Sequence, residues 1–141
     1  MKSKRPISVI VLILSIFFQA LSGLGGGVFL ITDPTGETLN LPLSFLRNSP
    51  FTDYLIPGII LFTVLGVYPL IVTAGLWKRK YWGWFGSIFL GVALLIWIFV
   101  EIIMIDYQSE PPLQLIYGIL GIVILLLSLL PGTKNFFIET K

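Results

Sequence analysis

Four long apolar segments constrain the fold of this chain more than any other feature of its sequence. They cover residues 7–31, 56–77, 82–105 and 113–130. A helix needs about 20 apolar residues to cross the hydrocarbon core of a bilayer, and each segment reaches or approaches that length. Only 11% of the 141 residues are charged, against roughly 25% in soluble domains. The sequence therefore predicts an all-α membrane protein, a single domain (1–141) with four transmembrane helices.

The basic residues predict how these segments are oriented. If the segments alternate across the membrane, only Arg47 falls on one side. The other basic residues fall on the opposite side, and they are Lys2, Lys4, Arg5, Lys78, Arg79, Lys80, Lys134 and Lys141. An excess of Lys and Arg stays cytoplasmic. We therefore expect both termini in the cytoplasm and the chain in a bacterial inner (plasma) membrane.

Short connections at 78–81 and 106–112 predict that neighbouring helices pack antiparallel as a bundle. Helices in lipid associate through small residues and interhelical hydrogen bonds, because apolar side chains gain nothing by leaving lipid. Gly23, Gly27 and Gly91 are small residues of this kind. We expect them to pack helices within the chain, with a face for dimerisation as the alternative.

Two residues near the middle of the first and second segments predict a polar contact and a distortion. An amide facing lipid costs several kcal/mol, so the Gln19 side chain is expected to hydrogen-bond to another helix. Pro69 has no N–H, which frees the carbonyl group of Leu65 and predicts a kink in the second segment. The kink is expected to serve packing, and the opening of a cavity is the alternative.

The polar segment 32–55 is expected to form a structured extracytoplasmic cap between helices 1 and 2. Asp33-Pro34-Thr35-Gly36 has the residue preferences of a type I turn. Residues 37–46 alternate imperfectly between leucine and other residues, which favours a short extended stretch half-buried on the bundle. Ser49-Pro50 is typical of a helix N-terminus, so a helical turn is expected to start there.

A candidate ligand pocket is predicted at the outer end of the bundle. Glu101 lies about one turn from the outer end of the third segment, and an acid at membrane depth is a functional hypothesis by default. Trp97 shares its helix face, and Gln114 and Tyr117 lie on the outer part of the fourth segment. Ligand sites combine an apolar body with a few polar groups. The alternative is a solvated or purely structural Glu101. The predicted pocket residues are Glu101, Gln114, Tyr117, Trp97, Asp53, Tyr54 and Asp33.

The chain contains neither cysteine nor histidine. It therefore lacks the usual ligands of zinc, haem and iron–sulfur clusters, as well as every nucleophile–histidine pair. We expect no metal, no cofactor and no nucleic-acid partner, and the lipid bilayer as surroundings. No motif indicates a particular protein family.

The function expected first is that of a non-enzymatic membrane protein, an accessory or structural subunit that binds a membrane-protein partner, a second copy or a lipid-like molecule. An oligomeric transporter or channel for a small solute or ion is one alternative, since four helices seldom enclose a pathway alone. A membrane-embedded isomerase is another. It would use Glu101 as general acid or base, assisted by Tyr117 or Tyr54.

Overall fold

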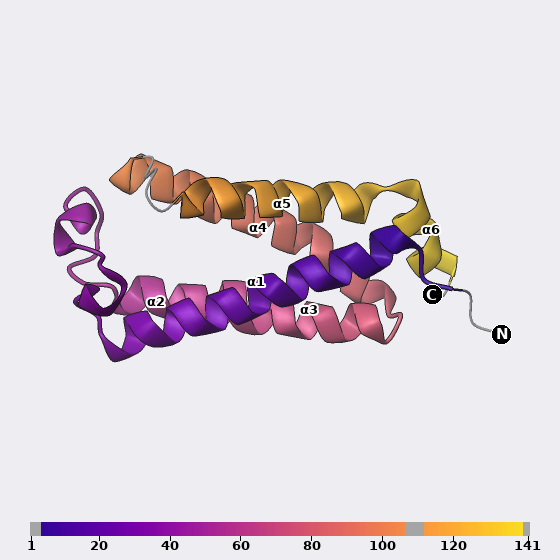
Figure 1. The fold of residues 1–141 in the computed structure, drawn as a ribbon, viewed down its shortest axis with the longest axis horizontal. Coiled ribbons are helices and arrows are strands. Elements are labelled where there is room, and N and C mark those ends of the chain that lie inside the picture. The colour runs from indigo at the N-terminus through magenta and orange to yellow at the C-terminus, as the bar shows by residue number, and fades with distance from the viewer. Residues whose placement is uncertain (1–3, 107–111, 140–141) are drawn as a thin grey trace.

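The computed structural model describes residues 4–106 and 112–139, and all regular structure within these ranges is helical (Figure 1). The elements are α1 (Ile7–Thr32), the 3-10 helices η1 (Glu37–Leu39) and η2 (Leu43–Leu46), α2 (Leu55–Phe62), the π-helical turn η3 (Thr63–Val67), α3 (Tyr68–Trp77), α4 (Tyr81–Ile105), α5 (Leu113–Leu129) and α6 (Pro131–Glu139). Lys2, Lys141 and most of the connection predicted at 106–112 lie outside the described residues.

Three helical stretches are long and apolar enough to cross a membrane, namely Ile7–Thr32, Leu55–Trp77 and Tyr81–Met104. A fourth stretch is long and apolar enough if α5 and α6, which meet at an angle of 57°, are counted together. The chain bends between them at Leu130, whose backbone is extended, next to Pro131. These stretches coincide closely with the predicted segments.

The second stretch is distorted where Pro69 was expected to distort it. The distortion takes the form of the π-helical turn η3, which lies directly before α3, and Pro69 occupies the first turn of α3. The Leu65 carbonyl group accepts a hydrogen bond from the Gln19 side chain of α1, with 3.0 Å between Nε2 and O. A π-helical turn contains one more residue than an α-helical turn. This extra residue accommodates the proline, so the helix continues from α2 through η3 into α3.

The helices pack as neighbouring pairs, and the two ends of the molecule differ. α1 packs on α2, η3 and α3, while α4 packs on α3 and α5. We call the end with the α3–α4 turn and α6 the turn end, and the end with residues 33–54 the loop end. Figure 1 shows the α1–α2 pair diverging from the α4–α5 pair towards the loop end, where η2 contacts α4.

Glycines allow α1 to approach the second stretch closely. A Cβ atom on Gly23 would lie 1.8 Å from the Leu65 carbonyl oxygen, and one on Gly27 would lie 2.6 Å from Phe62 Cβ. Gly91 of α4 is less constrained, since its Cβ would meet Leu125 Cβ at 3.1 Å. These contacts lie within the chain.

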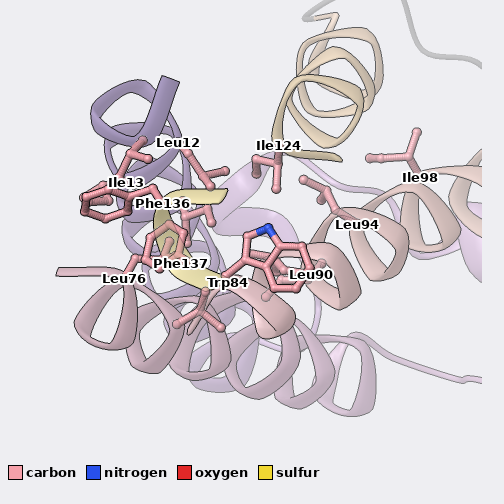
Figure 2. Close-up of a cluster of buried hydrophobic side chains, with 14 residues drawn as sticks. Leu12, Ile13, Leu76, Trp84, Leu90, Leu94, Ile98, Ile124, Phe136 and Phe137 are labelled. Carbon is pink, nitrogen blue, oxygen red and sulfur yellow. The ribbon is translucent and has the colours of Figure 1, made fainter. Parts of the chain in front are cut away.

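The main hydrophobic core occupies the turn end and the middle of the molecule (Figure 2). Side chains from α1, α3, α4 and α5 meet there, and α6 adds Phe136 and Phe137 across the end of the bundle. Phe137 is fully buried, and the rings of the two phenylalanines meet edge to face with centroids 5.0 Å apart. The nine-residue helix α6 therefore closes this end of the core.

A buried polar network joins α4 to α5 inside this core. Trp84 Nε1 donates to the Ser128 carbonyl oxygen at 2.8 Å, and the hydroxyl groups of Ser87 and Ser128 lie 2.8 Å apart. Each hydroxyl group has one proton to donate. If Ser87 donates to Ser128, Ser128 donates to the Ile124 carbonyl oxygen at 2.7 Å; in the reverse case Ser87 donates to the Trp84 carbonyl oxygen at 2.6 Å. Each buried polar group in the network has a partner, which avoids the cost of an unsatisfied donor.

A smaller core of Leu30, Leu46 and Tyr54 lies at the loop end. The predicted turn at 33–36 is present, because the Gly36 N–H bonds the Asp33 carbonyl group. The extended stretch predicted for 37–46 was wrong. Asn40 adopts a left-handed conformation (φ 57°), which breaks the alternation and separates the 3-10 helices η1 and η2.

The helical turn predicted to start at Ser49-Pro50 was also wrong. The Ser49 hydroxyl group accepts from the Phe51 N–H and donates to the Leu46 carbonyl group, so it closes a local turn instead of capping a helix. α2 begins at Leu55, whose N–H is bonded by the Asp53 carboxylate at 3.0 Å.

Candidate functional site

Three of the predicted pocket residues meet where α4 and α5 adjoin at the loop end. Glu101 lies in the last two turns of α4 and is partly buried. Its carboxyl group accepts hydrogen bonds from the side chains of Trp97 and Gln114. Trp97 precedes Glu101 by four residues and therefore shares its helix face, whereas Gln114 reaches it from the first turn of α5.

Gln114 is the most buried member of this cluster, with 3% of its surface exposed. Its Nε2 also donates to the backbone carbonyl oxygen of Asp106, directly after α4, at 3.2 Å. The amide thus joins the end of α4, the start of α5 and the Glu101 carboxyl group. We call Trp97, Glu101 and Gln114 the carboxyl cluster.

Tyr117 lies beside the carboxyl cluster, one turn further along α5 than Gln114. Its ring stacks on Phe18 of α1, with centroids 6.2 Å apart and planes inclined by 17°. This contact links α5 to α1 between the two diverging helix pairs. Phe18 was not among the predicted residues, because its exposed, apolar position resembles that of the other exposed apolar residues of α1.

Tyr54 lies at the end of the loop, directly before α2. It is buried, and its hydroxyl group donates to the Pro42 carbonyl oxygen at 2.7 Å. Burial raises the pKa of Tyr54, and the negative charge of Glu101 raises it further. The hydroxyl proton of Tyr54 is already engaged by the loop.

Asp33 and Asp53 do not join the carboxyl cluster. The Asp33 carboxylate accepts hydrogen bonds from the hydroxyl groups of Thr35 and Thr38 and from the Thr38 N–H. These bonds lower the pKa of Asp33 to about 2. Asp53 bonds the N–H of Leu55. Both acids organise the local backbone of the loop.

A groove of about 240 Å³ lies between α4 and α5 beside the carboxyl cluster. Gly118 creates space in it, since the nearest atom to an added Cβ, Ile98 Cγ2, would be 3.8 Å away. Gln114 is the one polar residue of the lining, which consists of Leu95, Ile98, Ile102, Gln114, Leu115, Gly118, Ile119 and Ile122. Gln114 thus touches both the groove and the Glu101 carboxyl group.

The importance of Gly118 for the groove was not predicted, although one signal indicates it. Gly118 follows Gln114 by four residues and so shares its helix face. A glycine, which has no side chain, next to a glutamine on the same helix face favours a hollow with a polar end.

A second hollow, of about 370 Å³, lies on the surface of the loop end. Its lining residues are Glu37, Asn40, Leu41 and Pro42. None of the carboxyl cluster contributes to it.

Within residues 4–106 and 112–139, no group of three Asp or Glu side chains gathers in a way that would hold a metal ion. Comparisons of the chain with models of protein families, with curated proteins and with solved structures find no match.

Proposed function

We propose that the chain is an integral membrane protein whose helices form an antiparallel bundle of four transmembrane segments. Large apolar side chains remain exposed along the helices, for example Ile7 (79%), Phe99 (65%) and Ile103 (64%), and lipid is the solvent that such a surface favours. In this proposal α5 (17 residues) makes the fourth crossing, and α6, beyond the bend at Leu130, lies across the turn end.

The turn end is proposed to face the cytoplasm of a bacterial cell. The described cations of the turn end are Lys4, Arg5, Lys78, Arg79, Lys80 and Lys134, whereas Arg47 lies in the loop. This distribution supports cytoplasmic termini. The loop of residues 33–54 then caps the bundle on the extracytoplasmic side.

We further propose that the protein is a non-enzymatic binding protein that holds a lipid-like molecule at the loop end of α4 and α5. The observation that carries this proposal is that an apolar groove touches the buried Gln114, whose amide bonds the Glu101 carboxyl group. The volume of the groove, about 240 Å³, is slightly below the range of about 300–1,000 Å³ typical of small-molecule sites. It suits one hydrocarbon chain whose polar end hydrogen-bonds at the carboxyl cluster.

Tyr54 supports binding over isomerase chemistry. A catalytic tyrosine needs a hydroxyl group directed at a substrate. The Tyr54 hydroxyl group donates to Pro42, and the Tyr117 ring stacks on Phe18. Of the two residues named as assistants of Glu101 in the isomerase hypothesis, Tyr54 thus has its hydroxyl group engaged in the fold.

Native mass spectrometry of the protein, extracted gently from its own membrane, tests this function. We expect the wild-type protein to retain one defined lipophilic molecule. Gly118→Leu fills the groove and should abolish that retention, and Glu101→Gln should weaken it. Gly25→Leu is the matched control, because Gly25 is an exposed helical glycine outside the groove and nothing lies within 4 Å of an added Cβ.

Equal loss of the molecule in the Gly25 and Gly118 variants would refute the site. Co-purification of a heteromeric assembly without any small molecule would refute lipid binding and favour an accessory subunit. Solute flux through liposomes that Glu101→Gln abolishes would favour the transporter hypothesis instead.

A further inference from the structure

The turn end brings together cationic side chains from three segments that are far apart in the sequence. They come from the N-terminal segment, the α3–α4 turn and α6. The cations are Lys4, Arg5, Lys78, Arg79, Lys80 and Lys134. We call them the basic rim. Glu139 is the one acid that the described residues contribute at this end.

Arg5 fixes the N-terminal segment to the end of α3. Its guanidinium group donates to the Trp77 carbonyl oxygen at 2.6 Å and lies 4.5 Å from the centroid of the Trp77 ring. Lys4 is consequently held beside the α3–α4 turn. The Trp77 ring itself remains 62% exposed.

α6 brings Lys134 to the same end. Its position is fixed by the burial of Phe136 and Phe137 in the core and by a hydrogen bond of 2.8 Å between the hydroxyl groups of Thr133 and Ser8. Lys134 follows Thr133 directly and is exposed.

The α3–α4 turn holds its three cations in a defined backbone. Hydrogen bonds from Lys80 N to Gly75 O and from Arg79 N to Leu76 O form a Schellman motif. Arg79 occupies the left-handed position of this motif (φ 60°), which glycine usually occupies. Its guanidinium group lies 5.2 Å from the Phe136 ring centroid on α6. A strained backbone position is thus occupied by a cation that contacts a second segment.

We propose that the basic rim binds the headgroup of an anionic phospholipid in the leaflet that surrounds the turn end. Charge complementarity supports this occupant, because four exposed lysines (Lys4, Lys78, Lys80 and Lys134) surround a surface with a single described acid. Trp77 and Trp82 are exposed beside them, and tryptophan favours the headgroup level of a bilayer. The inference is independent of the carboxyl cluster at the other end.

Reconstitution in nanodiscs tests the basic rim. One set contains phosphatidylcholine alone, and the other contains phosphatidylcholine mixed with phosphatidylglycerol. Retained lipids are read by native mass spectrometry, and stability is read from the midpoint of thermal unfolding. Both leaflets of a nanodisc have the same composition, so a change in insertion topology does not affect the result.

The wild-type protein should retain phosphatidylglycerol in preference to phosphatidylcholine and unfold at a higher temperature in its presence. Each of Lys4→Gln, Lys78→Gln, Lys80→Gln and Lys134→Gln should weaken the preference, by up to about fivefold, and the quadruple variant should lose it. Lys134→Arg keeps the charge and should preserve the preference. Arg47→Gln, at the loop end, is the matched control for loss of one positive charge.

Three results would overturn the proposal. They are an unchanged preference in the quadruple variant, an equal loss in Arg47→Gln, and equal stabilisation of the protein in phosphatidylcholine by soluble glycerol phosphate. Since the substituted lysines are exposed, circular dichroism of each variant should match that of the wild-type protein.

Discussion

The turn end and the loop end of this molecule use the same kind of helix in different ways. At the turn end, four helices and α6 enclose one continuous core, and the polar groups of Trp84, Ser87 and Ser128 satisfy one another. At the loop end, the helix pairs diverge, the core shrinks to three buried residues, and a carboxyl group lies next to an apolar groove.

The difference indicates that the turn end contributes mainly to stability and the loop end mainly to binding. Close packing and satisfied hydrogen bonds concentrate stability at the turn end. The loop end keeps a partly buried carboxyl group and space between helices, which costs stability and is typical of binding sites. Substitutions at the turn end should therefore change the free energy of unfolding, whereas those at the loop end should change local protection or binding.

Removal of a core phenylalanine at the turn end should have the largest effect. Phe137→Ala leaves a cavity at a fully buried position and should lower the free energy of unfolding by about 3–5 kcal/mol. Ile138→Ala, one residue further along α6 and 41% exposed, should cost much less. Denaturant titration in detergent micelles measures both variants. Equal losses would show that α6 does not close the core.

Addition of a methyl group where α1 meets the second stretch should have the next largest effect on the free energy of unfolding. Gly23→Ala places a Cβ 1.8 Å from the Leu65 carbonyl oxygen, so the backbones must separate, at a cost of about 1–3 kcal/mol. Gly25→Ala meets no neighbour and should be neutral or slightly stabilising, because alanine favours helix more than glycine. The same titration measures both. A neutral Gly23→Ala would contradict the close approach of the helices.

Loss of the hydrogen bond at the middle of the molecule should have an intermediate effect. Gln19→Leu leaves the Leu65 carbonyl group, freed by Pro69, without its donor. Hydrogen bonds between membrane helices contribute about 0.6 kcal/mol on average and up to about 1.7. The expected loss is modest, since the other amide atom of this buried side chain, Oε1, has no partner.

Hydrogen exchange of the amides in η3 and α3 provides a second measurement on Gln19→Leu. The amides of η3 should exchange faster than in the wild-type protein, whereas the exchange rates of the amides in α4 should stay unchanged. Faster exchange throughout the chain would mean that the bond supports the whole fold and not the proline distortion.

The smallest effect should come from acid titration of the loop. The pKa of Asp33 is lowered from 3.8 to about 2 by its bonds to Thr35 and Thr38, so its contribution is fully present above pH 3.8 and is lost as the pH falls towards 2. Exchange of the Thr38 amide should therefore lose protection over this window. Asp33→Asn should remove the pH dependence, and Asp53→Asn should leave it unchanged.

The apolar segments and the turn at 33–36 follow from local sequence, and the structure agrees with both. Pro69 predicted a kink, and the structure has a π-helical turn directly before α3. The expectations for Gln19 and for Leu65 arise separately from the sequence, yet they meet in a single hydrogen bond. Residues 37–46 were misjudged because alternating leucines suggest a strand, whereas the left-handed Asn40 and a contact with α4 decided the loop conformation. The role of α6 was missed because nine residues are too few to indicate a stable helix without its packing partners.

By itself, the sequence determined where the apolar helices lie, because apolar length and helix-breaking residues act locally. It also determined which residues carry charge at each end. Only the tertiary structure decided which helix faces meet, which acids bond the loop backbone and which acid joins Trp97 and Gln114. The reason is physical: apolar residues fit lipid and protein equally well, so periodicity along a membrane helix does not distinguish a packed face from an exposed one. The packed face is fixed by two kinds of contact. Glycines such as Gly23 approach a neighbouring backbone closely, and polar groups such as those of Gln19 and Leu65 form a hydrogen bond.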